Sequence, residues 1–245
     1  MPEVLRKYSY FGTGGTCLEL VVPSSGEQAR VTMQRLWQQG RPYFILGGGT
    51  NSLVSDEHWE GAALVLSELK ELRAHGNVIH AGAGVDNTDL ANFALSLGLS
   101  GAEFMNRLPG RIGGTVRMNA KCYGGEMSQI VQKVATVSPD GKHHDWRGKD
   151  VFRGYKDTNF MTNGHLVVGC EIVLQAGNAV DIAAKMQHCE NDRMGKHQFD
   201  FPSCGCVFKN DYSVGVPSGV LLHHSGAKKL SRLLKTTMIV PYGQL

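Results

Sequence analysis

The chain has 245 residues, a formal net charge of +3, 42% hydrophobic residues and 19% charged residues, values that are ordinary for a globular protein. So mild a charge, without any run of five like charges, argues against nucleic-acid binding, and no 18 apolar residues run together as a membrane span requires. The six cysteines are scattered and no apolar leader opens the sequence, so we expect reduced thiols and a cytoplasmic monomer.

The first third of the chain alternates strands with helices. Short apolar runs bounded by turn residues predict strands over 17–22, 43–46, 63–66 and 77–81. Apolar residues at helical spacing predict helices over 26–39 and 87–97. The apolar faces of these helices comprise Ala29, Met33, Leu36, Trp37, Leu90, Phe93, Ala94 and Leu97. Asn87 or Thr88 can cap the second helix.

The second half of the chain continues with longer elements. Strands are expected over 130–137 and 165–174, with a turn at 138–141 after the first of them. A boundary is expected at 175–178, and a helix over 180–194 follows through Ile182, Met186 and Cys189. A turn-rich segment, 201–206, leads into 207–210. This order of elements predicts an α+β fold in two parts.

Glycine is concentrated before residue 130, although the chain has 31 glycines in all. The clusters lie at 11–15, 47–51, 81–84, 110–114 and 123–125. A strand that runs into the 47–51 cluster presents main-chain N–H groups with no Cβ in the way, which close approach to a pyrophosphate needs. The 110–114 cluster has the same character. Two such loops point to a large anionic cofactor, whereas one alone would indicate only a tight turn.

A Rossmann dinucleotide site is the first alternative for the 47–51 loop. Glu68 lies about 20 residues after Gly47 and follows a strand, as that fingerprint requires. The intervening segment, 53–62, has no helical periodicity, however. Without a crossover helix there is no helix N-terminus to hold the phosphate, so the sequence argues against this fold.

Several motifs carry a family resemblance. They are Leu46-Gly-Gly-Gly-Thr-Asn51, Ala81-Gly-Ala-Gly84, Gly98-Leu-Ser-Gly-Ala-Glu-Phe104, Leu108-Pro-Gly-Arg-Ile-Gly-Gly-Thr-Val-Arg-Met-Asn-Ala120 and Tyr123-Gly-Gly-Glu126. In order and spacing they resemble the UDP-N-acetylenolpyruvoylglucosamine reductases, the MurB family, in its shorter type II form. The resemblance implies an FAD-binding domain of the vanillyl-alcohol-oxidase (PCMH) type, made of α+β subdomains 1–75 and 76–177. A smaller, shortened α+β substrate domain, 178–245, would follow.

The resemblance also implies an activity and a cofactor site. Family members use NADPH to reduce FAD, which then passes hydride from its N5 atom to the enolpyruvyl group of UDP-N-acetylglucosamine-enolpyruvate, giving UDP-N-acetylmuramate for peptidoglycan synthesis. By motif match, the residues expected to contact FAD are Gly47, Gly48, Gly49, Thr50, Asn51, Gly110, Gly113, Gly114 and Asn119.

The positions that match the family's catalytic residues carry other residue types in this chain. Where the family has a proton-donating serine, Gly205-Cys-Val-Phe-Lys-Asn210 carries Cys206, and a thiol is a stronger acid than an alcohol. Where the family has an arginine, Tyr155-Lys-Asp-Thr158 carries Lys156, with Thr158 in place of a serine. Lysine keeps the positive charge but loses the bidentate fork that suits a carboxylate.

The remaining family positions are less complete. Lys209 and Asn210 match residues near the UDP moiety, where their side chains could bind diphosphate and uracil. The family's C-terminal glutamate has no counterpart, because no Glu follows Glu190. Asp211, His223 or His224 could substitute, or the protein could be impaired. Two other functions therefore stay open: an FAD-dependent oxidoreductase with another substrate, and a catalytically impaired flavin-binding homologue.

A metal site is the remaining alternative. The residues that could assemble zinc are His188, Cys189, His197, Cys204 and Cys206. The Cys-x-Cys spacing at 204–206 is shorter than the usual gap between zinc-binding cysteines, and no spaced second pair accompanies it. We therefore expect no metal.

Overall fold

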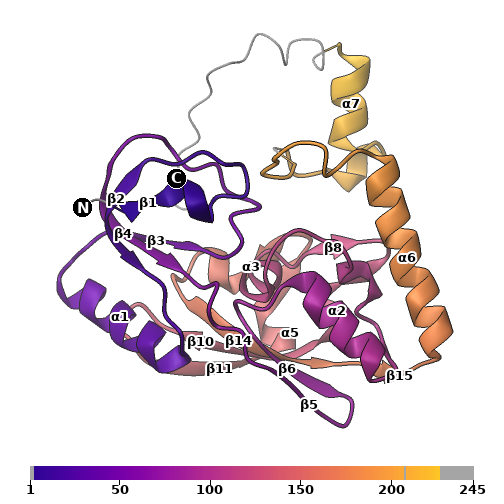
Figure 1. Cartoon of the computed structure of the whole chain (residues 1–245), viewed down its shortest axis with the longest axis horizontal. Helices are drawn as coiled ribbons and strands as arrows, with labels where there is room; N and C mark the ends of the chain where they lie inside the picture. The colour runs from indigo at the N-terminus through magenta and orange to yellow at the C-terminus, as the bar shows by residue number, and fades with distance from the viewer. Residues whose placement is uncertain (1–2, 207, 227–245) are drawn as a thin grey trace.

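A computed structural model describes residues 3–206 and 208–226, which contain two larger sheets of unlike topology and three two-stranded ones (Figure 1). The first sheet has the order β1 (Glu3–Val4), β2 (Thr16–Val21), β4 (Trp59–Val65) and β3 (Tyr43–Leu46). β2 and β3 run parallel to β4, and β1 is antiparallel to β2. No helix joins β3 to β4, so the crossover that a Rossmann site needs is absent from this described segment.

The second sheet is antiparallel throughout. Its order is β11 (His143–Arg147), β10 (Val131–Val137), β14 (Leu166–Val173), β6 (Val78–Gly82) and β5 (Leu72–His75). In Figure 1 it lies below α2 (Asn87–Ser96) and α3 (Ile112–Arg117). The largest apolar core packs between them, with Ile79, Leu90, Ile112 and Ile172 fully buried.

The helix α1 (Gly26–Gln38) connects the two sheets through a shared core. Its Ala29, Met33 and Leu36 pack in one cluster with Leu64 of β4 and Leu166 of β14. Burial of aliphatic side chains contributes about 1.5–3 kcal/mol for each large residue. The contact between the sheets is therefore a substantial apolar interface, and it fixes the loops that extend from their strands.

After β14 the described chain is mainly helical, apart from one short strand. β15 (Gln175–Ala176) pairs with β7 (Leu99–Ser100), and α6 (Ala179–Gly195) then packs on the second sheet's core through Ile182 and Met186. Asn178 caps α6 by accepting a 2.8 Å hydrogen bond from the Val180 N–H. In Figure 1, α6 rises from the sheets to α7 (Ser218–His224), none of whose residues is buried. Residues 178–206 and 208–226 include no strand of the sheet expected in a substrate domain.

Short elements complete the described part of the chain. They are η1 (Leu5–Tyr8), η2 (Glu103–Met105), β8 (Lys121–Cys122), β9 (Gly125–Glu126), α4 (Met127–Ile130), α5 (Gly148–Val151), β12 (Phe152–Gly154), β13 (Asp157–Thr158), η3 (Asn159–Met161) and η4 (Tyr212–Val214).

The α+β fold predicted from the sequence is confirmed, with local differences. Trp37 is 58% exposed, because the buried stripe of α1 runs through Thr32 instead. The cap of α2 is Asp86, whose carboxylate accepts a 2.8 Å hydrogen bond from the Thr88 N–H, in place of the expected Asn87 or Thr88. β5 and β11 were not predicted, since both are largely exposed and polar.

Candidate functional site

The two glycine-rich loops predicted to bind a cofactor lie against each other. We call them the paired glycine loops: 47–51, which follows β3, and 109–114, whose last three residues begin α3. The Thr50 hydroxyl donates a 3.2 Å hydrogen bond to the Pro109 carbonyl. A Cβ atom added to Gly48 would lie only 3.3 Å from the Gly110 Cα. The structure therefore brings together two segments that the sequence separates by some sixty residues.

The glycines of these loops serve different purposes. Gly49 has φ +64°, and a Cβ there would come within 2.9 Å of the Ser9 Cα and closer still to the Tyr8 carbonyl. A Cβ on Gly113 would meet the Ala83 Cβ at 2.8 Å. These two glycines are required by packing. Gly114, in contrast, has no atom within 4 Å of its Cβ position, and Gly47 none closer than 3.9 Å, so their main chains are open to a ligand.

Asn119 is buried and its side chain is occupied within the protein. Its Nδ2 donates to Glu126 Oε1 at 2.6 Å and to the Gly154 carbonyl at 2.9 Å, while its Oδ1 accepts from the Ser128 N–H at 3.0 Å. Both amide hydrogens are thus used. Asn119, predicted from the family motif to contact FAD, holds the segment after α3 against the β12–β13 hairpin.

That hairpin carries Lys156, which is at its turn with φ +47°. The Lys156 Nζ lies 5.8 Å from the centroid of the Tyr155 ring. The Lys209 Nζ, from a segment far along the chain, lies 5.8 Å from the same centroid. Two ammonium groups on one aromatic ring create a positive region suited to an anion. Lys156 and Lys209 were predicted separately, and the structure places both ammonium groups near the Tyr155 ring.

The segment that carries Cys206 approaches the first glycine loop. A Cβ on Gly205 would lie 3.6 Å from the Thr50 carbonyl oxygen and 3.7 Å from Asn51 Oδ1. Cys206 itself is exposed, and Val207 lies outside the described residues. Asn210 is half-buried, and its Oδ1 accepts a 3.0 Å hydrogen bond from the Ser218 N–H at the start of α7. The amide oxygen of this predicted substrate residue is therefore already engaged.

Asp211, His223 and His224, which the sequence suggested for the role of the family's glutamate, lie on α7 and just before η4. Asp211 accepts hydrogen bonds from the hydroxyl and the N–H of Ser213, at 2.6 and 2.9 Å, and these hold the pKa of its carboxyl below the ordinary value. A carboxylate so stabilised is a poor proton donor. The His223 and His224 rings lie on α7 with centroids 5.6 Å apart, and both are exposed.

A buried hydroxyl beside the first glycine loop was not predicted from the sequence. Ser9 Oγ is buried and has no hydrogen-bond partner among the residues that the structure describes, and the same holds for Thr13 Oγ1. Such atoms normally have a partner in a folded protein. The open main chains of Gly47 and Gly114 fit the phosphate groups of a nucleotide cofactor.

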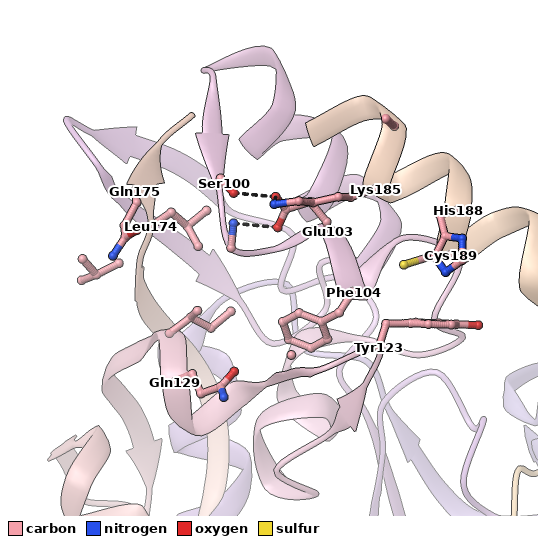
Figure 2. Close-up of a pocket in the computed structure, with 15 residues that line it drawn as sticks. Ser100, Glu103, Phe104, Tyr123, Gln129, Leu174, Gln175, Lys185, His188 and Cys189 are labelled. Atoms are coloured by element: carbon pink, nitrogen blue, oxygen red, sulfur yellow. Dashed lines mark hydrogen bonds and ion pairs between the residues drawn. The ribbon is translucent and has the colours of Figure 1, made fainter. Parts of the chain in front are cut away.

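A cavity of about 690 Å³ lies elsewhere, between α6 and the segment that follows β7 (Figure 2). Glu103 lies in its wall and accepts hydrogen bonds from the Ser100 hydroxyl at 2.6 Å and the Gly101 N–H at 2.7 Å. Lys185 Nζ is 3.9 Å from the same carboxylate. None of the residues predicted to bind cofactor or substrate lines this cavity. It is therefore separate from the paired glycine loops.

The described residues also bear on metal and membrane sites. Within 3–206 and 208–226, no three His, Cys, Asp or Glu residues are grouped so that they could hold a metal ion. No helix in this part of the chain is long and apolar enough to cross a membrane.

Comparisons with known proteins agree with this geometry. Residues 18–147 match the model of the FAD binding domain family, so the chain carries an FAD-binding domain. The chain is 33% identical to the UDP-N-acetylenolpyruvoylglucosamine reductase of Lactobacillus helveticus over 84% of its own length and 69% of that protein. It is 32% identical to the reductase of Clostridium perfringens strain SM101, over 93% of the chain and 74% of that protein.

Comparison with solved structures also finds a reductase of this family. The MurB structure from Thermus caldophilus superposes with a TM-score of 0.77 at 28% identity, covering 92% of this chain and 79% of that one. A glucose dehydrogenase, Phl p 4.0202, shares the fold alone, with a TM-score of 0.51 at 14% identity. The chain belongs to the UDP-N-acetylenolpyruvoylglucosamine reductase family, and it is a flavoprotein oxidoreductase. The resemblance and the FAD-binding fold predicted from the sequence are confirmed.

Proposed function

We propose that this protein reduces UDP-N-acetylglucosamine-enolpyruvate to UDP-N-acetylmuramate with FAD and NADPH, a step of peptidoglycan synthesis. One observation carries the proposal: the ammonium groups of Lys156 and Lys209 each lie 5.8 Å from the centroid of the Tyr155 ring. Asn119 ties the hairpin of Lys156 to the segment following the second glycine loop. The substrate carries a carboxylate and a diphosphate, so two neighbouring cations suit it.

The paired glycine loops would hold the cofactor. Gly47 and Gly114 offer unobstructed main chain, and Gly48 lies against Gly110 where the loops meet. Main-chain N–H groups at such positions bind phosphate oxygens. Thr50 and Asn51 would complete the contacts from the first loop. Bound FAD supplies the hydride, from its N5 atom, and NADPH is the source of that hydride.

Lys156 would bind the carboxylate of the enolpyruvyl group. Addition of hydride to a double bond conjugated with a carboxylate develops negative charge on the carboxylate side. A fixed ammonium group stabilises that charge more than it stabilises the neutral double bond, so its effect is greatest in the transition state. The left-handed main chain at Lys156, φ +47°, supports a position set by the hairpin turn.

Cys206 would donate the proton that completes the reduction. The S–H bond breaks, a C–H bond forms at the carbon next to the carboxylate, and the thiolate recovers a proton from solvent. Taken together, one hydride from NADPH and one proton reduce one double bond. The approach of Gly205 to Thr50 and Asn51 supports this role, since it brings the neighbouring thiol toward the cofactor loop.

Lys209 and Asn210 would bind the UDP moiety. The Lys209 ammonium suits the diphosphate as a point charge. The Asn210 amide nitrogen can donate to uracil while its oxygen stays bonded to the Ser218 N–H. We propose that Cys206 supplies the proton and that Lys156 stabilises the developing negative charge.

The sheets support a division of the chain in part. We propose FAD-binding subdomains 1–75 and 76–177: the strands of the first sheet end at Val65, and four of the five strands of the second sheet lie between Val78 and Val173, whereas β5 (Leu72–His75) of that sheet lies before the proposed boundary. Residues 178–245 would belong to the substrate domain. A cytoplasmic monomer stays our prediction, which size-exclusion chromatography with light scattering tests for the oligomeric state.

The test is steady-state turnover by the purified protein with its FAD. NADPH oxidation is followed with UDP-N-acetylglucosamine-enolpyruvate, and UDP-N-acetylglucosamine without the enolpyruvyl group is the control. We expect oxidation only with the first compound and a product heavier by two hydrogens. Flavin reduction by NADPH that neither compound accelerates would assign the site to another substrate. A flavin that NADPH never reduces would indicate an impaired homologue.

A further inference from the structure

We propose that the guanidinium group of Arg111 binds the diphosphate of FAD, in addition to the glycine main chains expected to contact the cofactor. The inference rests on the proposed position of FAD at the paired glycine loops. Arg111 is the one charged residue of these loops, 47–51 and 109–114. Main-chain N–H groups meet a diphosphate with partial charges alone, so a full positive charge at the same place would complete the site.

The aliphatic part of the Arg111 side chain crosses from the second glycine loop to the first. A Cβ atom added to Gly48 would lie 3.6 Å from the Arg111 Cγ, and one added to Gly47 would lie 4.0 Å from the Arg111 Cβ. The same Cβ position of Gly47 is 3.9 Å from the Gly114 N, and no other atom outside its chain neighbours is closer. The open main chains of Gly47 and Gly114 therefore border the same space as the Arg111 side chain. A diphosphate on those main chains would lie within reach of the guanidinium group.

One hydrogen bond holds the guanidinium group at this place. Arg111 Nη1 donates to the Gly84 carbonyl at 2.6 Å, which ties the second glycine loop to the 81–84 cluster. That cluster is itself fixed, because the Gly113 N–H donates to the Ala83 carbonyl at 2.9 Å. An arginine held at one corner loses less conformational freedom when its other donors bind a ligand.

The other donors of Arg111 are accessible and have no partner in the described part of the chain. A guanidinium group has five N–H donors, and Nη1 alone donates a hydrogen bond here. Arg111 is half-buried, and its Nε and Nη2 are not among the buried atoms that lack a partner, so both reach solvent. Its charge is not paired with a carboxylate of the described residues, whereas Arg107 Nε lies 3.5 Å from Glu190. A planar fork with an unpaired charge suits two phosphate oxygens.

The experiment compares Arg111→Gln and Arg111→Lys with Arg107→Gln. Arg107 is the matched control, a nearby arginine that is already paired with Glu190 and lies 4.9 Å from the centroid of the Phe199 ring. Apoprotein of each variant and of the unaltered protein is titrated with FAD at low and at high ionic strength. The melting temperature of each apoprotein is measured as well. Arg111 is half-buried and gives up one hydrogen bond, so its variants are expected to fold.

We expect Arg111→Gln to raise the FAD dissociation constant roughly tenfold or more, as for a lost hydrogen bond to a charged group. High ionic strength should weaken FAD binding less in this variant than in the unaltered protein, because the charge that salt screens is gone. Arg111→Lys keeps the charge without the fork and should bind FAD with intermediate affinity. Arg107→Gln should bind FAD as the unaltered protein does.

Unchanged FAD affinity in Arg111→Gln, or an equal loss in Arg107→Gln, would overturn the inference. Arg111→Lys that binds FAD no more tightly than Arg111→Gln would also overturn it, since the positive charge would then contribute nothing. Where Arg111→Gln is too unstable to titrate, Arg111→Lys decides, and affinity equal to that of the unaltered protein would count against the guanidinium group. Failure of the unaltered protein to bind FAD would instead refute the cofactor site itself.

Discussion

The hydroxyl of Thr158 donates a 2.6 Å hydrogen bond to the main-chain carbonyl of Arg117, the last residue of α3. Thr158 is fully buried, and the Arg117 guanidinium in turn donates to the Phe160 carbonyl. With the bond from Asn119 to Gly154, these contacts fasten the hairpin of Lys156 to the helix that follows the second glycine loop. The position that holds a serine in the family's motif therefore has a structural role here.

Thr158→Val should lower the free energy of unfolding by about 1–3 kcal/mol, because the buried Arg117 carbonyl loses its donor. Thr158→Ser keeps the hydroxyl and should retain most of the stability. Thr162→Val, at an exposed residue of the same region, is the matched control and should have little effect. Urea denaturation measures all three. Equal stability of Thr158→Val and the unaltered protein would contradict this role.

Gly49→Ala should abolish FAD binding, whereas Gly114→Ala should be tolerated by the fold. The first change strains a residue at φ +64° and drives a Cβ into the main chain of Tyr8 and Ser9. The second puts a methyl group into open space. Circular dichroism and FAD titration separate folding from binding. If Gly114→Ala also weakens FAD while the fold stays intact, that result locates the cofactor at the second loop.

Lys156→Gln should lower kcat by about 10²-fold, the usual effect of removing one stabilising group from a developing charge. Lys209→Gln should mainly raise KM, by about tenfold, because its charge binds substrate and transition state alike. The control is Lys149→Gln, an exposed lysine of α5. A fall in kcat with Lys209→Gln alone would reverse the two assignments.

Cys206→Ala should lower the rate of substrate reduction by about 10²–10⁴-fold, the typical contribution of a positioned proton donor. NADPH should still reduce the flavin at its normal rate, since that half of the reaction needs no proton from Cys206. Cys206→Ser should keep much of the activity. Stopped-flow absorbance resolves the two halves, and Cys204→Ala is the neighbouring control. Full activity of Cys206→Ala would remove the thiol from the mechanism.

Stability in acid should depend on Glu19. Hydrogen bonds from Arg35, opposed by partial burial and assisted by the charges of Arg35 and Arg41, hold the pKa of Glu19 below its ordinary value of 4.5. A lowered folded-state pKa contributes stability that is complete above 4.5 and is lost as the pH falls through the lower value. Glu19→Gln should therefore flatten the acid side of the stability profile, measured by urea unfolding at several pH values. An unchanged profile would show that the cluster contributes nothing.

Local sequence patterns were sufficient to predict many of the helices and strands. β3 was predicted over its observed bounds, Tyr43–Leu46, because an apolar run ends there at a glycine loop. α1 followed from its apolar spacing. β11 was missed because its residues, His143–Arg147, are mostly exposed and pair only along one edge, so no alternation marks them. Pattern reasoning detects buried elements better than exposed ones.

The candidate site was predicted residue by residue but not as an arrangement. Nothing in the sequence indicates that Lys156 and Lys209 meet on Tyr155, since that contact depends on tertiary folding. The family motif assigned Asn119 to the cofactor, whereas its side-chain bonds to Glu126 and Gly154 become visible only in the structure.

The most direct test of the account is the visible spectrum of the purified protein under anaerobic conditions, first with NADPH and then with UDP-N-acetylglucosamine-enolpyruvate. The account predicts an oxidised-flavin band that NADPH bleaches and that returns rapidly when the enolpyruvyl compound is added. A colourless protein that takes up no FAD, or a reduced flavin that the enolpyruvyl compound leaves unchanged, would contradict it.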